Sequence, residues 1–236
     1  MEQVNVHSQR EVPGARVPWV VGVSGASGTP YAAAVLRGLL DAGESVDLVV
    51  SRASRLTLLD ETGIAFRDAH WRDDLATWLA RGADGKPGTF PVGDGYLDGV
   101  RHWSAGDLGA GPSSGSYPVR GMLIVPASTA SVAGVALGLS KDLLQRAASV
   151  TLKERRRLVV AVRETPLNGQ TLRHLVTLDE AGAVVLPASP AFYAGATHIQ
   201  DLVDFVAGRV LDAAGVPHSL YRRWEGELGG GSRPPG

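Results

Sequence analysis

The chain has 236 residues, of which 44% are hydrophobic and 20% charged, and its formal net charge is −1. This length is enough for one sizeable core, and the near-neutral charge provides no basic field for binding nucleic acid. The absence of cysteine excludes disulfides, thiolate catalysis and cysteine-ligated zinc, and no apolar run approaches the roughly 20 residues that span a bilayer. The first 18 residues lack the apolar core of a secretion signal, so we expect a cytoplasmic protein.

The predicted elements alternate between strand and helix along the chain. Strand-like apolar runs occur at 19–23, 45–50, 121–125, 158–162 and 183–187. Helical patterns lie at 29–42, 52–61, 129–138, 141–157, 168–181 and 199–214. The strand runs are short, β-branched and apolar on both faces, as buried parallel strands are. We therefore predict a single α/β domain at 19–226, with a Rossmann-like (flavodoxin-like) doubly wound parallel sheet and flanking helices.

The remaining segments have a different composition. Residues 82–118 are rich in Gly and Pro and predict a long loop, within which 99–103 has the pattern of a short strand. A loop of this length in a compact domain is usually functional or mobile. The terminal segments 1–18 and 227–236 are predicted to be a flexible extension and a disordered tail.

The turn after the first predicted strand is rich in glycine. The stretch VVGVSGASGTP has glycines at 22, 25 and 28 and leads directly into the first predicted helix. Glycines at this place let backbone amides approach a phosphate, and ligands of open α/β sheets bind beyond the carboxyl ends of the strands. The spacing is not the dinucleotide pattern G-x-G-x-x-G, and Ser51-Arg52 stands where an NAD site needs Asp or Glu. NADP, a mononucleotide, or tight strand–helix packing without a ligand remain as interpretations, and the nucleophile-elbow spacing G-x-S-x-G is absent.

Cations and hydroxyls elsewhere suggest a second anion site. Arg146 and Lys153 are seven residues apart, so two helical turns place them on nearly the same face. They indicate either an anion site or a solvated basic helix end favoured by the helix dipole. The segment Ser113, Ser114, Gly115 and Ser116 is either a backbone nest for an oxyanion or a flexible linker. The six histidines have no metal-ligand spacing, so no metal site is predicted.

Several motifs in order resemble the UbiX-type flavin prenyltransferases. They are GASG, SRA, LLDET, SSGS, PASTAS, PAFY and, as the most specific stretch, RAASVTLKERRRLVVAVRETPL. The likeness extends from about residue 19 to Trp224, apart from the 82–110 loop and both tails. The resemblance implies transfer of a dimethylallyl group from dimethylallyl phosphate to N5 and C6 of reduced FMN, without a metal. The product, prenylated FMN, is the cofactor of UbiD-type decarboxylases.

The resemblance also implies roles for particular residues and an assembly. The flavin site is expected to contain Gly25, Ala26, Ser27, Ser51, Ser128, Thr129, Ala130, Ser131 and Arg163. The prenyl-phosphate site is expected to contain Arg146, Lys153, Tyr193 and Arg209, with Ser113, Ser114, Gly115 and Ser116 from a neighbouring subunit. Glu61, Glu164, Lys153 and Arg146 match residues implicated in the chemistry, and Trp224 matches an aromatic residue that closes the pocket. Relatives form trimers that assemble into dodecamers, so we expect a homo-oligomer.

Two other functions stay open at this point. An FMN-dependent oxidative cysteine decarboxylase of the same superfamily would reduce its flavin when substrate is added, whereas a prenyltransferase needs flavin that is already reduced. A non-catalytic flavin-binding partner subunit is the second alternative, and the joint presence of Lys153, Arg163, Glu164, Tyr193 and Arg209 argues against it. The residues do not decide which decarboxylase receives the product, or whether the donor is a mono- or diphosphate.

Overall fold

The computed structural model describes residues 16–224 and 226 of the chain. The predicted tail at 227–236, and residues 1–15 of the predicted extension, lie outside the described residues. No helix in the described part is long and apolar enough to cross a membrane.

The fold is built on one parallel sheet. Its strands are β1 (Trp19–Val23), β2 (Val46–Val50), β3 (Val100–Ser104), β4 (Gly121–Ala127), β5 (Arg157–Val162) and β6 (Val184–Pro187). They lie in the order β3-β2-β1-β4-β5-β6, and every neighbouring pair is parallel. The predicted Rossmann-like doubly wound sheet is thus confirmed. The strand order reverses between β1 and β4, and ligands of such sheets bind at this switch point.

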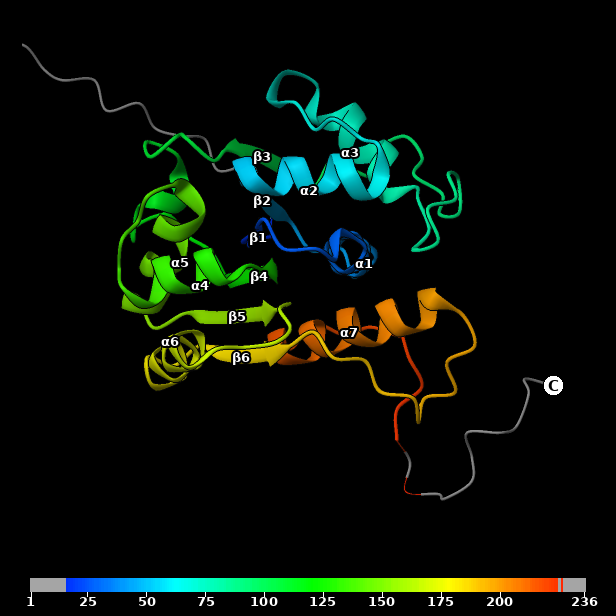
Figure 1. Cartoon of the computed structure of the whole chain (residues 1–236). Coiled ribbons are helices and arrows are strands. Elements are labelled where there is room, and N and C mark those ends of the chain that lie inside the picture. The colour runs from blue at the N-terminus through cyan, green and yellow to red at the C-terminus, as the bar shows by residue number, and fades with distance from the viewer. Residues whose placement is uncertain (1–15, 225, 227–236) are drawn as a thin grey trace, which may run out of the picture.

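Helices cover both faces of the sheet (Figure 1). One face packs against α1 (Thr29–Asp41), α2 (Arg52–Thr62), α3 (Trp71–Leu79) and α7 (Ile199–Ala214). The other face packs against α4 (Thr129–Ala136), α5 (Leu143–Lys153) and α6 (Gly169–Glu180). Because strand side chains alternate between faces, Val21 and Leu123 belong to the first core, and Val20 and Met122 to the second.

The segments with weaker sequence signals contain additional structure. Helix α3 follows a short 3-10 helix, η1 (Asp68–His70), in a stretch for which no element was expected. The long loop contains the suggested strand, as β3, and a short 3-10 helix, η2 (Gly111–Ser113). The helix expected to run to residue 157 ends at Lys153, where the chain turns through Arg155 at a positive φ of 55° and enters β5.

Candidate functional site

Two glycines in the turn between β1 and α1 are required by local geometry. A Cβ added to Gly25 would lie 2.5 Å from the Cβ of Ala53 in α2, so only glycine allows this close approach. Gly28 has a φ of 109°, in the region that favours glycine. Tight packing therefore accounts for both glycines, but it leaves a ligand possible. The amides of Gly25 and Ser27 donate to no acceptor within the described residues, and they lie beside the N-terminus of α1.

The carboxylate of Glu61, near the end of α2, holds this turn in place. It accepts hydrogen bonds from the Gly28 amide at 2.8 Å, the Thr29 amide at 2.8 Å and the Thr29 hydroxyl at 2.6 Å. Burial raises the pKa of Glu61, but hydrogen bonds from Ser27, Thr29 and the Gly28 amide outweigh it, so the pKa is below its usual value. Glu61 thus behaves as an ionised anchor at a helix N-terminus, and its suggested part in the chemistry stays a prediction.

The other residues assigned to the flavin are gathered at the same edge of the sheet. Ser51 and Ser128 follow β2 and β4 and cap α2 and α4, accepting hydrogen bonds from the Ser54 and Ser131 amides at 3.1 and 3.2 Å. Arg163 follows β5, and its Nε donates to the Ser27 carbonyl at 2.9 Å. The N-termini of α1, α2 and α4 therefore lie at one edge of the sheet, and the Arg163 guanidinium lies beside the turn before α1. This arrangement favours an anionic ligand. This edge fits a phosphate-bearing group such as FMN.

Sequence reasoning missed Ser24, which joins two of these turns. It is fully buried at the end of β1, its hydroxyl donates to the Pro126 carbonyl at 2.8 Å, and it accepts from the Ser128 amide at 2.7 Å. The sequence signal that could have identified Ser24 is a serine directly after an apolar strand. Glu164 lies at the same edge, is exposed, and accepts a hydrogen bond from the Thr165 amide at 3.1 Å.

One group of residues assigned to the prenyl phosphate lies beside α5. The Nε of Arg146 donates to the Ser113 carbonyl at 3.0 Å, and a Cβ added to Gly115 would lie 2.8 Å from the Nζ of Lys153. Lys153 also pairs with Glu154 at 2.6 Å, and the Ser114 and Ser116 hydroxyls lie 3.0 Å apart. Both cations reach the same loop, which confirms that they share a helix face.

A second group lies beside α7. Tyr193 packs edge-on against Phe205 and Trp224, with ring centroids 5.7 and 5.9 Å apart. Arg209 is half exposed, and its Nη1 donates to Asp212 at 2.9 Å. With Asp212 and Arg223 it lines an open hollow of about 590 Å³ next to β6. Tyr193 and Trp224 are in contact through their rings, and their role in closing a pocket stays a prediction.

The two groups lie on opposite faces of the sheet. Helix α5 packs in the core that contains Val20 and Met122, whereas α7 packs in the core that contains Val21 and Leu123. Figure 1 shows the two helices separated by the strands. One copy of the chain therefore does not bring Lys153 and Arg209 to a common ligand.

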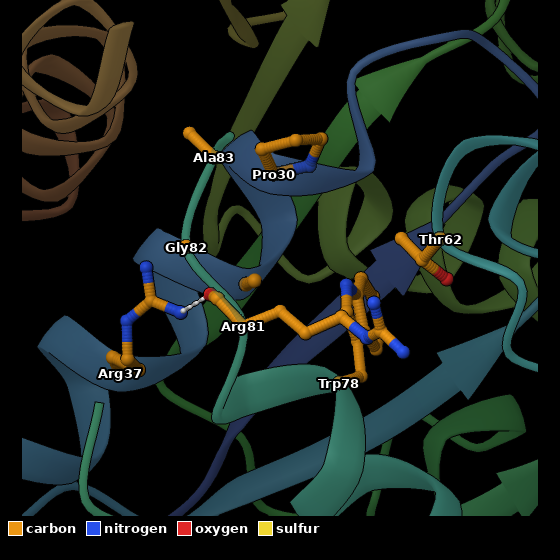
Figure 2. Close-up of a pocket in the computed structure, with 8 residues that line it drawn as sticks. Pro30, Arg37, Thr62, Trp78, Arg81, Gly82 and Ala83 are labelled. Atoms are coloured by element: carbon orange, nitrogen blue, oxygen red, sulfur yellow. Dashed lines mark hydrogen bonds between the residues drawn. The ribbon is translucent and has the colours of Figure 1, made fainter. Parts of the chain in front are cut away.

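A separate small cavity lies between α1, α3 and the start of the long loop. Its volume is about 20 Å³, room for a water molecule, and Figure 2 shows Pro30, Arg37 and Trp78 among its lining residues. The Nη1 of Arg37 donates to the Leu79 carbonyl at 3.0 Å, and its guanidinium lies 3.7 Å from the centre of the Phe90 ring. None of the residues assigned to flavin or prenyl phosphate lines this cavity, so we interpret it as part of the attachment of the long loop to α1.

Within residues 16–224 and 226, no group of three or more His, Cys, Asp or Glu side chains could hold a metal ion. The chemistry available at the sheet edge and beside α5 and α7 comes from backbone amides, hydroxyls, cations and carboxylates. Such groups bind and stabilise anions and move protons.

Comparisons with known proteins agree with this geometry. Residues 7–211 match the model of the Flavoprotein family. The chain is 86% identical over 220 residues to the flavin prenyltransferase UbiX of Streptomyces coelicolor, and the aligned region covers 93% of this chain and 100% of that protein. The crystal structure of AnUbiX in complex with FMN and dimethylallyl pyrophosphate matches with a TM-score of 0.75 at 33% identity, over 90% of this chain and 100% of that one. A dodecameric FMN-dependent UbiX-like decarboxylase from Escherichia coli matches with a TM-score of 0.74 at 32% identity, over 89% and 100% of the two chains.

Proposed function

The chain belongs to the Flavoprotein family and, within it, to the UbiX flavin prenyltransferases, and we propose that it transfers a dimethylallyl group from dimethylallyl phosphate to reduced FMN. The observation that carries this proposal is the gathering of the assigned flavin residues at one sheet edge, beside helix N-termini and Arg163. When bound, reduced FMN supplies the N5 and C6 atoms that accept the prenyl group, and the product is prenylated FMN.

At this edge the chain's own residues bind and orient the flavin. The free amides of Gly25 and Ser27, and the N-termini of α2 and α4, provide donors for anionic groups. Arg163 provides a fixed positive charge next to Ser27. Glu164 follows it directly and is exposed, so its carboxylate is free to accept a proton during prenyl transfer.

The prenyl donor is handled by the residues beside α5 and α7. Arg146, Lys153 and Arg209 stabilise the phosphate as it leaves, because cations placed where negative charge develops lower the barrier. The faces of Tyr193 and Trp224 tolerate positive charge on the allyl group. Since these residues lie on opposite faces of one chain, we propose that neighbouring copies supply them to a shared site.

The proposed assembly is a homo-oligomer, and we expect a dodecamer. Support comes from the dodecameric UbiX-like structure and from large apolar side chains that this chain exposes, among them Leu56, Leu137, Leu172 and Phe192. Light scattering coupled to gel filtration measures the mass of the assembly, and a monomer at micromolar concentration would contradict this proposal.

Two further parts of the proposal concern the cell. The product is expected to pass to a UbiD-type decarboxylase, and the location is expected to be the cytoplasm, which suits a chain without cysteine. Copurification with such a decarboxylase, and fractionation of the source cells, test these two points separately.

The decisive experiment is to incubate the purified protein with reduced FMN and dimethylallyl phosphate, and then to measure the mass of the extracted flavin. We expect the flavin to gain one five-carbon unit, and none with oxidised FMN. A parallel reaction with dimethylallyl diphosphate identifies the preferred donor. An unchanged flavin mass with both donors would refute the proposal, and flavin reduction by a cysteine peptide would favour the decarboxylase alternative.

A further inference from the structure

A buried carboxylate in β2 has no place in the site described so far. Asp47 is 1% exposed, and its carboxylate accepts hydrogen bonds from Trp103 Nε1 at 3.0 Å and from the Tyr117 hydroxyl at 2.9 Å. Burial raises the pKa of Asp47, while the hydrogen bonds from Trp103 and Tyr117 oppose that shift. Because a buried carboxylate is costly unless its oxygens accept hydrogen bonds, loss of either bond is unfavourable. Asp47 therefore holds the side chains of Trp103 and Tyr117 in defined positions.

Tyr117 is the residue through which this carboxylate reaches the loop beside α5. Its ring lies edge-on to Trp103, with centroids 6.4 Å apart, and a Cβ added to Gly111 would lie 2.6 Å from it. Its hydroxyl donates to Asp47 and accepts from Arg101 Nη1 at 3.0 Å. Burial and the neighbouring carboxylate raise the pKa of Tyr117 to about 12, so the hydroxyl keeps its proton at neutral pH. The segment 111–117 therefore folds around a ring that is pinned to the sheet.

The backbone of the same loop is held from the other side by α5 and the residues after it. Arg156 donates to the Gly115 carbonyl at 2.8 Å and to the Tyr117 carbonyl at 3.0 Å. Arg146 donates to the Ser113 carbonyl at 3.0 Å. The two arginines hold the loop against α5, and the Tyr117 side chain holds it against the sheet. Both anchors together define where the loop lies.

We propose that Asp47 and Tyr117 are positioning residues that hold the Ser113–Ser116 loop for the prenyl-phosphate donor. This inference rests on the proposed function, which assigns that loop and Lys153 to the donor. Loss of the bond between the two side chains frees the ring to move and loosens the loop, so the loop must be ordered again each time the donor binds. The flavin residues lie at the carboxyl ends of the strands, whereas Asp47 is the second residue of β2, near the amino end of that strand. We therefore expect flavin binding to be unaffected.

Tyr117→Phe is the test variant, because it removes the hydroxyl and keeps the ring. We expect the KM for dimethylallyl phosphate to rise about three- to tenfold, which is the size of effect expected for the loss of one ordinary hydrogen bond. The kcat and the Kd for FMN should stay within about twofold, since the ring and the residues of the flavin edge are unchanged.

Two matched controls separate positioning from stability. Trp103→Phe removes the other hydrogen bond to the same carboxylate, keeps an aromatic ring beside Tyr117 and leaves the bond between Tyr117 and Asp47 in place. It should therefore lower the melting temperature and change the donor KM less than Tyr117→Phe does. Tyr96→Phe removes a second tyrosine–aspartate bond, from Tyr96 to Asp41 at 2.8 Å, in another part of the long loop, and should leave the donor KM unchanged. If Tyr117→Phe does not fold, as judged by circular dichroism, Asp47→Asn replaces it. This variant leaves one accepting oxygen for the two donors, so the expected rise in the donor KM has the same direction and is smaller.

The outcomes are distinct. An unchanged donor KM in Tyr117→Phe, an equal rise in Trp103→Phe, or a parallel loss of FMN affinity would each overturn the positioning role. Lys153→Ala reports on the underlying assignment. If it leaves the donor KM unchanged, the donor site of the proposed function is wrong and the positioning role is lost with it. If it raises the KM while Tyr117→Phe does not, only the positioning role is refuted.

Discussion

Replacing Glu61 by glutamine tests how the β1–α1 turn is held. The carboxylate accepts three hydrogen bonds, from the amides of Gly28 and Thr29 and from the Thr29 hydroxyl. A glutamine side chain keeps one accepting oxygen and presents an NH₂ group where the second oxygen stood. Hydrogen bonds to charged groups contribute about 1.5–3 kcal/mol each, and partial exposure of Glu61 favours the low end of that range. We expect Glu61→Gln to lower the free energy of unfolding by about 2 kcal/mol, or about 4–8 °C in melting temperature.

The pH dependence of this loss identifies its cause. The folded-state pKa of Glu61 is below its usual value, so its stabilising effect is complete above the unfolded pKa of about 4.3 and is lost as pH falls through the folded pKa. Urea unfolding of both proteins at pH 7, 5 and 4 measures the difference, which should shrink at the lowest pH. Glu180→Gln is the control, because Glu180 is exposed at the end of α6 and should cost nothing measurable. A difference that stays constant across this pH range, or an equal effect of Glu180→Gln, would refute the reasoning.

Three other predictions concern single residues. Glu164→Gln should reduce the rate of prenyl transfer about 10²–10⁴-fold with unchanged FMN affinity, because it removes a proton acceptor. Stopped-flow kinetics measures the rate and calorimetry measures the FMN affinity, and weakened FMN binding would instead indicate that Glu164 orients Arg163. Arg209→Ala should raise the half-saturating donor concentration at least about tenfold and leave FMN binding unchanged, since loss of a cation–phosphate contact costs more than the roughly 1.4 kcal/mol that corresponds to a tenfold change. Separate titrations of donor and FMN test both parts, and loss of FMN binding alone would show that Arg209 binds the phosphate of the flavin instead of that of the donor. Gly28→Ala should lower the melting temperature more than Gly63→Ala in scanning calorimetry, because both have positive φ but only Gly28 would crowd the Tyr31 ring, at 2.8 Å; equal losses would contradict this.

Strong local patterns made most of the fold predictable. Predicted strands such as 19–23 and helices such as 199–214 coincide with β1 and α7, because continuous β-branched runs and helical periodicity are both clear there. Helix α3 was missed although Trp71, Leu75, Trp78 and Leu79 have helical spacing. Polar residues between these positions weaken the pattern, and burial under the long loop supplies the stability that the local sequence lacks.

The placement of several assigned residues at one edge of the sheet was predictable from the sequence, whereas their side-chain contacts were not. Motifs placed Ser51, Ser128 and Arg163 at strand ends, and a parallel sheet necessarily brings such ends to one edge. The role of Glu61 as an anchor depends on a contact between α1 and α2 that no local pattern encodes. In the same way, the bond between Asp47 and Tyr117 joins residues 70 positions apart, and sequence reasoning treated Asp47 only as a mid-strand residue.

The placement of Lys153 and Arg209 on opposite faces of the sheet has a genetic consequence. If neighbouring copies share a site as proposed, two alleles altered at Lys153 and at Arg209 damage different contributions of the chain to that site. In a mixed assembly, some sites draw an intact lysine from one polypeptide and an intact arginine from its neighbour. Coexpression of the two alleles should therefore give mixed assemblies with more prenyltransferase activity than assemblies made from either altered chain alone.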